Sequence, residues 1–99
     1  MRYEFEAPLW VWTSGNAPAS WRFVTLPLDV SDAIRALTPL RNGFGSVRIA
    51  ATVGRTTWKT SLFPSKEHGA FLLPMKANVR KKETLADGDV IKVAVELDF

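Results

Sequence analysis

Two alternating runs on either side of Gly54-Arg55 constrain the fold of this chain more than any other feature. The segment from Arg41 to Pro64 predicts a loop, a strand, a tight turn and a second strand. Glycine at the first of two central positions is typical of a type II′ hairpin loop. That loop places small Ala51 opposite large Trp58, as a packed cross-strand pair requires. The same register predicts three further pairs on this face: Val47 with Leu62, Ile49 with Thr60, and Val53 with Thr56.

The other face of the predicted hairpin is polar and carries two cations. Its residues are Arg48, Ala50, Thr52, Thr57, Lys59 and Ser61. We therefore expect one face to be buried and the other to be solvated.

The composition favours one domain, residues 1–99, in a soluble cytoplasmic protein. The 99 residues are 46% hydrophobic, which is enough for a core. Thirteen Lys and Arg against ten Asp and Glu give a net charge of +3, less than a dedicated nucleic-acid binder usually concentrates on one face. The absence of cysteine excludes disulfides, thiolate metal sites and cysteine nucleophiles. Glu4 and Glu6 interrupt the apolar residues after Met1, so we expect no signal peptide, and no apolar run could span a bilayer.

The chain before the hairpin predicts two strands and a short helix. Tyr3 to Trp12 alternates, and its expected inward residues are Tyr3, Phe5, Ala7, Leu9 and Val11. Pro8 indicates an edge strand or a bulge. A second strand covers Trp21 to Leu26 and ends at Pro27. The apolar stripe Val30, Ile34 and Leu37 predicts a helix of about three turns, with Asp29, Ser31 and Asp32 at its N-terminus and Thr38-Pro39 as its stop.

Trp10 and Trp12 allow two interpretations. From Leu9 to Trp12 both faces are apolar, so we expect this end of the strand to be covered on both sides. Core or rim packing is the more common state of a tryptophan. The alternative is an exposed platform that stacks on a base or a sugar.

The chain after the hairpin predicts a short strand, a short helix and a last strand. Ala70 to Leu73 ends in Pro74, Met75 to Lys82 is helical for about two turns, and Leu85 to Asp89 forms a turn. Val90 to Phe99 alternates. Its expected inward residues are Ile91, Val93, Val95 and Leu97, with Lys92 and Glu96 outward.

A unit of strand, proline, helix, glycine turn and strand occurs twice. Pro27 and Pro74 lie 47 residues apart, and the strands that follow begin at Val47 and Val90. One copy could not bury its apolar face alone, whereas two copies could close a barrel with pseudo-twofold symmetry. The sequence therefore predicts a mainly β protein: a small closed or partly open barrel of about six strands with two short helices. Because an internally duplicated barrel needs no partner to close, we expect a monomer.

The chain resembles two related groups of proteins. The second repeat, from Leu73-Pro74 through Arg80 to Gly88-Asp89-Val90, is similar to the swapped hairpin of AbrB-type transcription regulators, which bind DNA and form their barrel as a dimer. The whole chain resembles more closely a family defined as a domain of unknown function, DUF1905. The matching motifs are Leu9-Trp10-Val11-Trp12, Trp21-Arg22-Phe23-Val24-Thr25-Leu26-Pro27, Gly43-Phe44-Gly45-Ser46-Val47, Trp58-Lys59-Thr60-Ser61-Leu62-Phe63-Pro64, Leu73-Pro74-Met75-Lys76-Ala77-Asn78-Val79-Arg80-Lys81 and Gly88-Asp89.

This second resemblance implies a fold but no activity. Its members look like a bacterial, single-chain double-split β-barrel related to the AbrB group. Phe71 departs from the family pattern, in which a tyrosine is expected at this position, so a role for a hydroxyl there does not carry over.

Residues for catalysis or metal binding are sparse. His68, the only histidine, lies in a polar loop and is expected to be a surface residue without a nucleophile to serve. One histidine with scattered carboxylates does not make a metal site, and Asp87 and Asp89 around Gly88 fit a turn. Gly43-Phe44-Gly45 lacks the spacing of a phosphate-binding loop, and we expect Phe44 to enter the core. We expect no metal and no cofactor, and an enzyme is the weaker class.

Two groups of polar and basic residues are candidate binding sites. The first, for an anionic ligand, combines Arg41, Ser46, Arg48, Lys59 and Ser61. The second is a basic patch of Lys76, Arg80, Lys81 and Lys82. Either group could hold an anionic ligand or a phosphate backbone, although surface cations more often form only a solvated face.

Two functional hypotheses follow from these residues. The first is a non-enzymatic binding or accessory domain for a small anionic ligand or a protein partner, with no membrane association. The second is a nucleic-acid-binding barrel of the AbrB type. A third hypothesis, an enzyme, would require a pocket holding a titratable group with a shifted pKa, and the sequence offers no candidate for that group.

Overall fold

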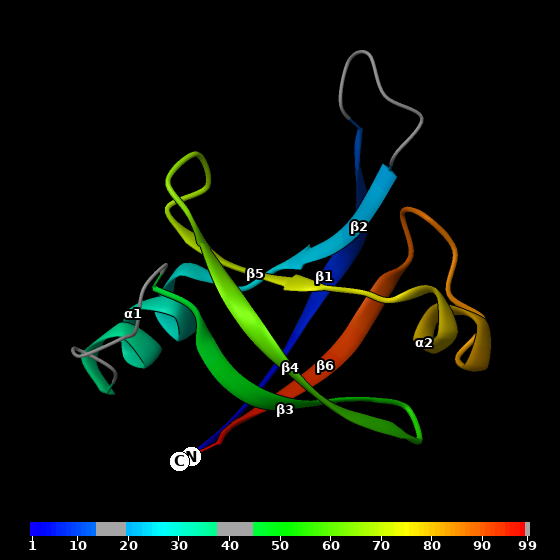
Figure 1. Cartoon of the computed structure of the whole chain (residues 1–99). Helices are drawn as coiled ribbons and strands as arrows, with labels where there is room; N and C mark the ends of the chain where they lie inside the picture. Colours follow the sequence, from blue (N-terminus) through cyan, green and yellow to red (C-terminus); the bar gives the residue numbers. More distant parts are fainter. Residues whose placement is uncertain (14–19, 38–44, 99) are drawn as a thin grey trace.

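The computed structural model describes residues 1–13, 20–37 and 45–98. Its elements are β1 (Arg2–Thr13), β2 (Ser20–Thr25), α1 (Leu28–Leu37), β3 (Val47–Val53), β4 (Thr56–Ser65), β5 (Ala70–Pro74), α2 (Ala77–Lys82) and β6 (Val90–Leu97). The six strands close into an antiparallel barrel in the order β1-β2-β5-β4-β3-β6 (Figure 1). This confirms a mainly β fold with a closed barrel and two short helices. Among the described residues, no helix is long and apolar enough to cross a membrane.

The central hairpin has the predicted register. Val47 lies opposite Leu62 and Ala51 lies opposite Trp58, and the pairs between these two have the predicted partners as well. Gly54 has a φ of +58°, the left-handed conformation that favours glycine at this turn. A side chain at Gly54 would also overlap the carboxylate of Glu83, which accepts a 2.7 Å hydrogen bond from the Thr56 hydroxyl. The turn is therefore held against the end of α2.

Exchanging the two copies of the repeat leaves the strand order of the barrel unchanged. The first copy consists of β1, β2, α1 and β3, and the second consists of β4, β5, α2 and β6 in the same order. The corresponding strands β2 and β5 pair with each other, and so do β3 and β6. Thr25 lies opposite Leu72, and each stands two residues before the proline of its copy. Figure 1 shows α1 and α2 on opposite sides of the barrel, as this arrangement requires.

The long strands β1 and β4 each change partner within their length. β1 pairs with β6 from Arg2 to Pro8 and with β2 from Leu9 onward. β4 pairs with β3 as far as Leu62 and with β5 from Phe63 onward. Pro8 lies where β1 leaves β6 and just before β1 pairs with β2, so it has a strand partner on one side only, as the predicted edge position requires. A residue without an N–H fits this point.

The core fills the barrel and reaches under both helices. The inward residues expected for β6 are all buried, and so are Phe5, Ala7 and Leu9 of β1. Ile34 of α1 is fully buried, whereas Leu37, expected on the same stripe, is 42% exposed. Ser31 does not cap the helix; it is fully buried, and its hydroxyl accepts a 3.1 Å hydrogen bond from the Phe71 amide of β5. A buried hydroxyl thus joins α1 to the barrel wall.

The outer end of β1 differs from the prediction. Val11, expected inward, is 36% exposed and Trp12 is 46% exposed. From Leu9 onward β1 pairs only with β2 on one side, and Figure 1 shows these two strands rising together beyond the barrel. This end is therefore not covered on both faces, and for Trp12 the prediction of core or rim packing is wrong.

Candidate functional site

Three of the residues expected to bind an anion, Arg48, Lys59 and Ser61, lie together on the outer face of the hairpin but share it with acids. Arg48 is directly opposite Ser61, and Lys59 lies two residue pairs along, opposite Ala50. The Lys59 ammonium is 3.7 Å from the carboxylate of Asp98. Glu96 follows on β6, which lies beside β3, so the face carries mixed charge. Ser46 is half-buried just before β3, and Arg41 lies outside the described residues, as do Gly43 and Phe44.

The basic patch lies on α2 and the residue before it. Lys76, Lys81 and Lys82 are exposed, whereas Arg80 is half-buried and its Nε donates a 3.1 Å hydrogen bond to the Met75 carbonyl. Arg80 therefore supports the start of its own helix.

A different set of side chains lines a broad concave surface. We call it the aromatic trough; it has a volume of about 600 Å³. Its lining residues are Trp10, Trp12, Trp21, Phe23, Phe63, Pro64, Ser65, Glu67, His68, Leu72 and Pro74. They come from β1, β2, β4, β5 and the loop between β4 and β5.

The period of two in the strands explains why these aromatic residues gather on one face. Trp10 lies opposite Phe23, and Trp12 lies opposite Trp21, so two cross-strand pairs form one wall. The ring centroids of Trp10 and Phe23 are 5.3 Å apart, a favourable aromatic contact. The inward neighbours Leu9 and Val24 are buried, which fixes the aromatic side chains on the outside. In Figure 1 the β1–β2 arm, which carries these residues, rises opposite the arm formed by β4 and β5.

The second copy of the repeat supplies the opposite wall. Leu62 is buried at the point where β4 changes partner, and Phe63 after it is 45% exposed and lines the trough. On β1, likewise, Leu9 is buried at the point where the strand changes partner, and Trp10 after it lines the trough. The two arms of the duplicated fold therefore each place an aromatic residue on the trough.

His68 closes one end of the trough against Trp10. Their ring centroids are 5.2 Å apart, and the His68 Nδ1 lies 2.9 Å from the Ser65 hydroxyl oxygen. That oxygen also accepts the His68 backbone N–H at 3.3 Å. In the neutral imidazole with its proton on Nε2, the Ser65 hydroxyl donates to Nδ1. His68 is exposed, as predicted, but it belongs to the trough wall.

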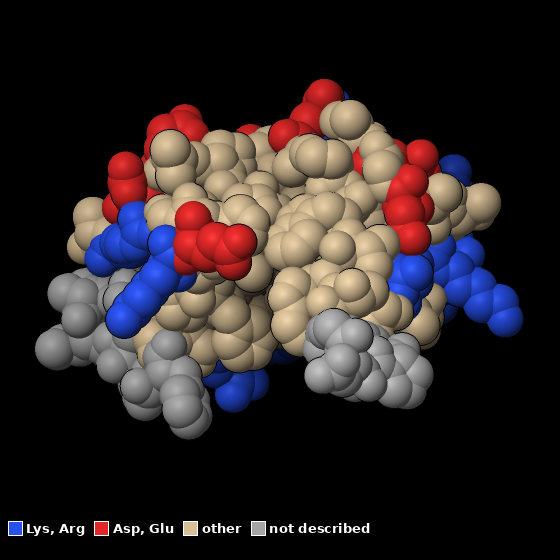
Figure 2. Space-filling view, turned by 90° about the horizontal axis from the view of Figure 1, so that it is seen from above, with Lys and Arg blue, Asp and Glu red and all other residues tan. Residues whose placement is uncertain are grey.

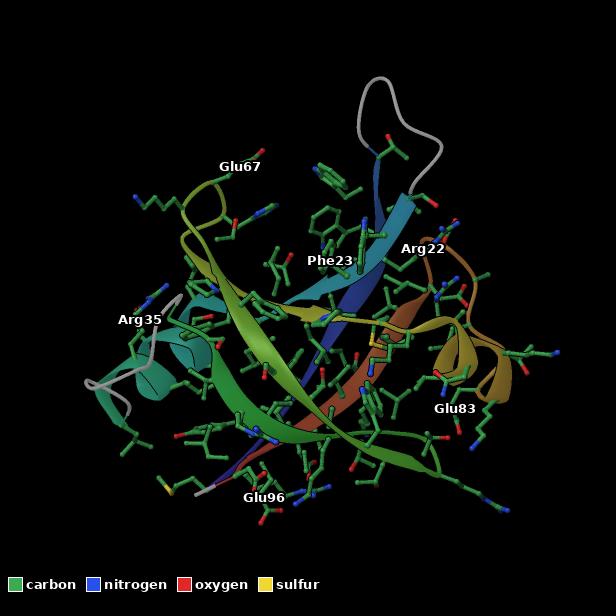
Figure 3. All side chains as sticks on the ribbon, viewed as in Figure 1. Arg22, Phe23, Arg35, Glu67, Glu83 and Glu96 are labelled. Carbon is green, nitrogen blue, oxygen red and sulfur yellow. The ribbon has the colours of Figure 1, made fainter. Side chains whose placement is uncertain are left out.

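The charge of the trough comes from one carboxylate. Among the described residues that line it, Glu67 is the only Asp, Glu, Lys or Arg. Figure 3 shows Glu67 at the tip of the β4–β5 loop, with its side chain directed toward the β1–β2 arm. Figure 2 looks onto this end of the molecule and shows charged side chains on both sides of a broad uncharged stretch.

Arg22 lies on the opposite face of β2 from the trough (Figure 3). Its Nε is 3.1 Å from one oxygen of the Asp87 carboxylate, and a terminal nitrogen is 3.2 Å from the other. These hydrogen bonds from Arg22 lower the pKa of Asp87 and raise that of Arg22. The pair ties the β1–β2 arm to the turn before β6.

This ion pair predicts a pH dependence of stability. Because the pKa of Asp87 is lower in the folded chain, its contribution is present above the unfolded pKa of about 3.9 and is lost as the pH falls through the folded value. As the pH is lowered below about 4, the free energy of unfolding should fall less in Asp87→Asn than in wild type. Urea denaturation at a series of pH values measures this. Arg22→Gln should show the same smaller fall; equal pH slopes in all three proteins would contradict the prediction.

The aromatic trough was only partly visible in the sequence. Trp10 and Trp12 were candidates for a stacking platform, but Trp21, Phe63 and His68 were not joined to them. The available signal was tryptophan on the face of β1 that otherwise carries Glu4 and Glu6. Among the described residues, no three His, Asp or Glu side chains gather as a metal site requires.

A family model described as a domain of unknown function (DUF1905) matches residues 5–95. No curated protein matches the chain.

Proposed function

The chain belongs to the DUF1905 family, and we propose that it is a non-enzymatic binding domain whose ligand is a small organic molecule held in the aromatic trough. The observation that carries the proposal is the trough itself: about 600 Å³, walled by three tryptophans and two phenylalanines. This volume is within the range of about 300–1,000 Å³ that is typical of small-molecule sites, which are mostly apolar and aromatic. We also retain the double-split class, a bacterial source and a cytoplasmic location as parts of this proposal.

The fixed position of the Trp10 ring supports binding. The indole N–H of Trp10 donates a 2.8 Å hydrogen bond to the Thr25 hydroxyl, which fixes that ring on the barrel wall. Trp10 also contacts both Phe23 and His68. A site whose rings are already held in place loses little conformational entropy when a ligand binds.

A fragment screen with matched variants tests this proposal. Small molecules are screened by ligand-observed NMR against the wild-type protein, the double variant Trp12→Ala/Phe63→Ala and the control Leu28→Ala. Leu28 is an exposed apolar residue on α1, away from the trough lining. Fragments that bind wild type should bind the control and lose at least about tenfold in affinity for the double variant, since large aromatic contact area is removed. Equal binding to all three proteins, or no binding fragment, would contradict the proposal.

A second candidate is nucleic-acid binding through α2. It is supported by the exposed cations Lys76, Lys81 and Lys82, which lie within seven residues. If these three contact phosphates, affinity for random DNA should fall about 40-fold between 50 and 200 mM salt, from the release of counterions. Lys81→Ala/Lys82→Ala should reduce both the affinity and the salt slope. Absent or salt-insensitive binding to duplex and single-stranded DNA would eliminate this candidate.

A further inference from the structure

The chemistry of the trough walls distinguishes between classes of ligand. Trp10, Trp12 and Trp21 present indole rings, and Phe23 and Phe63 add two phenyl rings. The face of an aromatic ring carries partial negative charge and attracts a cation within about 6 Å, most strongly for tryptophan. Five such rings around one space make an environment that favours positive charge.

The formal charge carried by the described lining residues is also negative. Glu67 is a lining residue, and no lysine or arginine lines the described part of the trough. Arg22, on β2 between Trp21 and Phe23, lies on the other face and is bound to Asp87. An anion in the trough would therefore find a carboxylate and ring faces but no lining lysine or arginine as a partner.

Three polar groups of the trough are bonded to partners within the protein. The Trp10 indole N–H is bonded to Thr25, and the Ser65 hydroxyl and His68 Nδ1 are bonded to each other. A sugar or a nucleobase is usually recognised by several converging donors and acceptors. A quaternary ammonium group needs none, because its charge is covered by methyl groups.

We propose that the ligand of the aromatic trough is an organic cation with an alkylated ammonium group, held by the ring faces and by the carboxylate of Glu67. This inference rests on the proposed function and specifies its substrate class. It also reverses the sign of the ligand charge that the sequence suggested, because the candidate anion-binding residues Arg48, Lys59 and Ser61 lie elsewhere, on the outer face of the hairpin.

A pair of probes with the same shape isolates the charge. Choline and 3,3-dimethylbutan-1-ol differ in that a quaternary nitrogen in the first is a carbon in the second. Each is titrated into the full chain while the indole N–H signals of the tryptophans are followed by NMR. We expect choline to bind at least about tenfold more tightly than the alcohol, with the shifts at Trp10, Trp12 and Trp21.

Two substitutions distinguish the contribution of the ring faces to choline binding from that of apolar area and from that of the carboxylate. Trp12→Leu keeps an apolar side chain but removes the ring, and should weaken choline at least about fivefold while changing the alcohol less. Glu67→Gln should weaken choline about two- to threefold, since an exposed carboxylate contributes little. Trp58→Phe, outside the trough lining, is the control and should leave both affinities unchanged.

The outcomes separate this inference from the proposed function. Equal or tighter binding of the alcohol in the trough would overturn the cation inference and leave a small-molecule site. Failure of choline to bind at 100 mM would also overturn the cation inference, while the fragment screen decides the proposed function independently. Choline binding that persists unchanged in Trp12→Leu and Glu67→Gln would overturn the assignment of the cation to this site.

Discussion

Phe71→Ala is expected to lower the free energy of unfolding by about 3–5 kcal/mol, the usual cost of removing a buried phenyl ring. Phe71 is the largest of the fully buried side chains, with 0% exposure, on β5 in the barrel wall. Its amide donates to the buried Ser31 hydroxyl, its carbonyl accepts from the Leu26 amide, and the Arg35 guanidinium lies 5.4 Å from its ring centroid. The ring therefore lies where α1, β2 and β5 meet. Urea denaturation followed by circular dichroism measures the change.

Phe63→Ala is the matched control for this substitution. Phe63 precedes Pro64, which lies opposite Phe71 in the sheet, but its ring is 45% exposed and faces the trough. We expect a change of only about 0.5 kcal/mol, as for most surface positions. The same variant should lose affinity for trough ligands. Similar stability losses for the two variants would show that the outer and inner faces of this sheet are assigned wrongly.

Leu9→Ala and Leu62→Ala are each expected to lower the free energy of unfolding by about 2–5 kcal/mol. Both leucines are at most 1% exposed and lie where a long strand changes partner. The Leu9 amide and carbonyl also bond to Asp89 and Gly88, so this position joins β1 and β2 to the turn before β6. Because the two leucines occupy corresponding places in the two copies, we expect similar costs, within about 1.5 kcal/mol of each other.

The control for the leucine pair is Leu28→Ala, at a position that is exposed on α1. It should change stability by about 0.5 kcal/mol or less. Thermal and urea denaturation of the three variants provide the comparison. A cost near zero at either Leu9 or Leu62 would contradict the equivalence of the two partner-switch points.

Those parts of the fold that depend on local pattern were predictable. The register of β3 and β4 follows from the alternation on both sides of Gly54-Arg55, and the structure confirms it pair by pair. The duplication, read from Pro27 and Pro74, predicted that two copies close one barrel, and corresponding strands do pair. Short-range periodicity and turn chemistry set these features, and both are visible in the sequence.

The trough could not be predicted because it depends on contacts between distant segments. Trp10 meets His68 only because closure of the barrel brings the β1–β2 arm opposite the β4–β5 arm. Likewise, nothing local to Lys59 shows that Asp98 will lie beside it. Alternation gives the face of a strand, but not whether that face extends beyond the barrel, as it does at Trp12. The anion-binding role of Arg48, Lys59 and Ser61 stays a prediction.

The central claim, that ligands enter the aromatic trough, is tested most directly by the four indole N–H signals in a ¹H–¹⁵N NMR titration with the tightest fragment from the screen. Trp10, Trp12 and Trp21 line the trough, whereas Trp58 lies across from Ala51 on the β3–β4 hairpin and serves as an internal control. We predict that the first three signals shift with one common Kd and that Trp58 does not move. Shifts confined to Trp58, or to the amides of Arg48 and Lys59, would contradict the claim and return the ligand to the outer face of the hairpin.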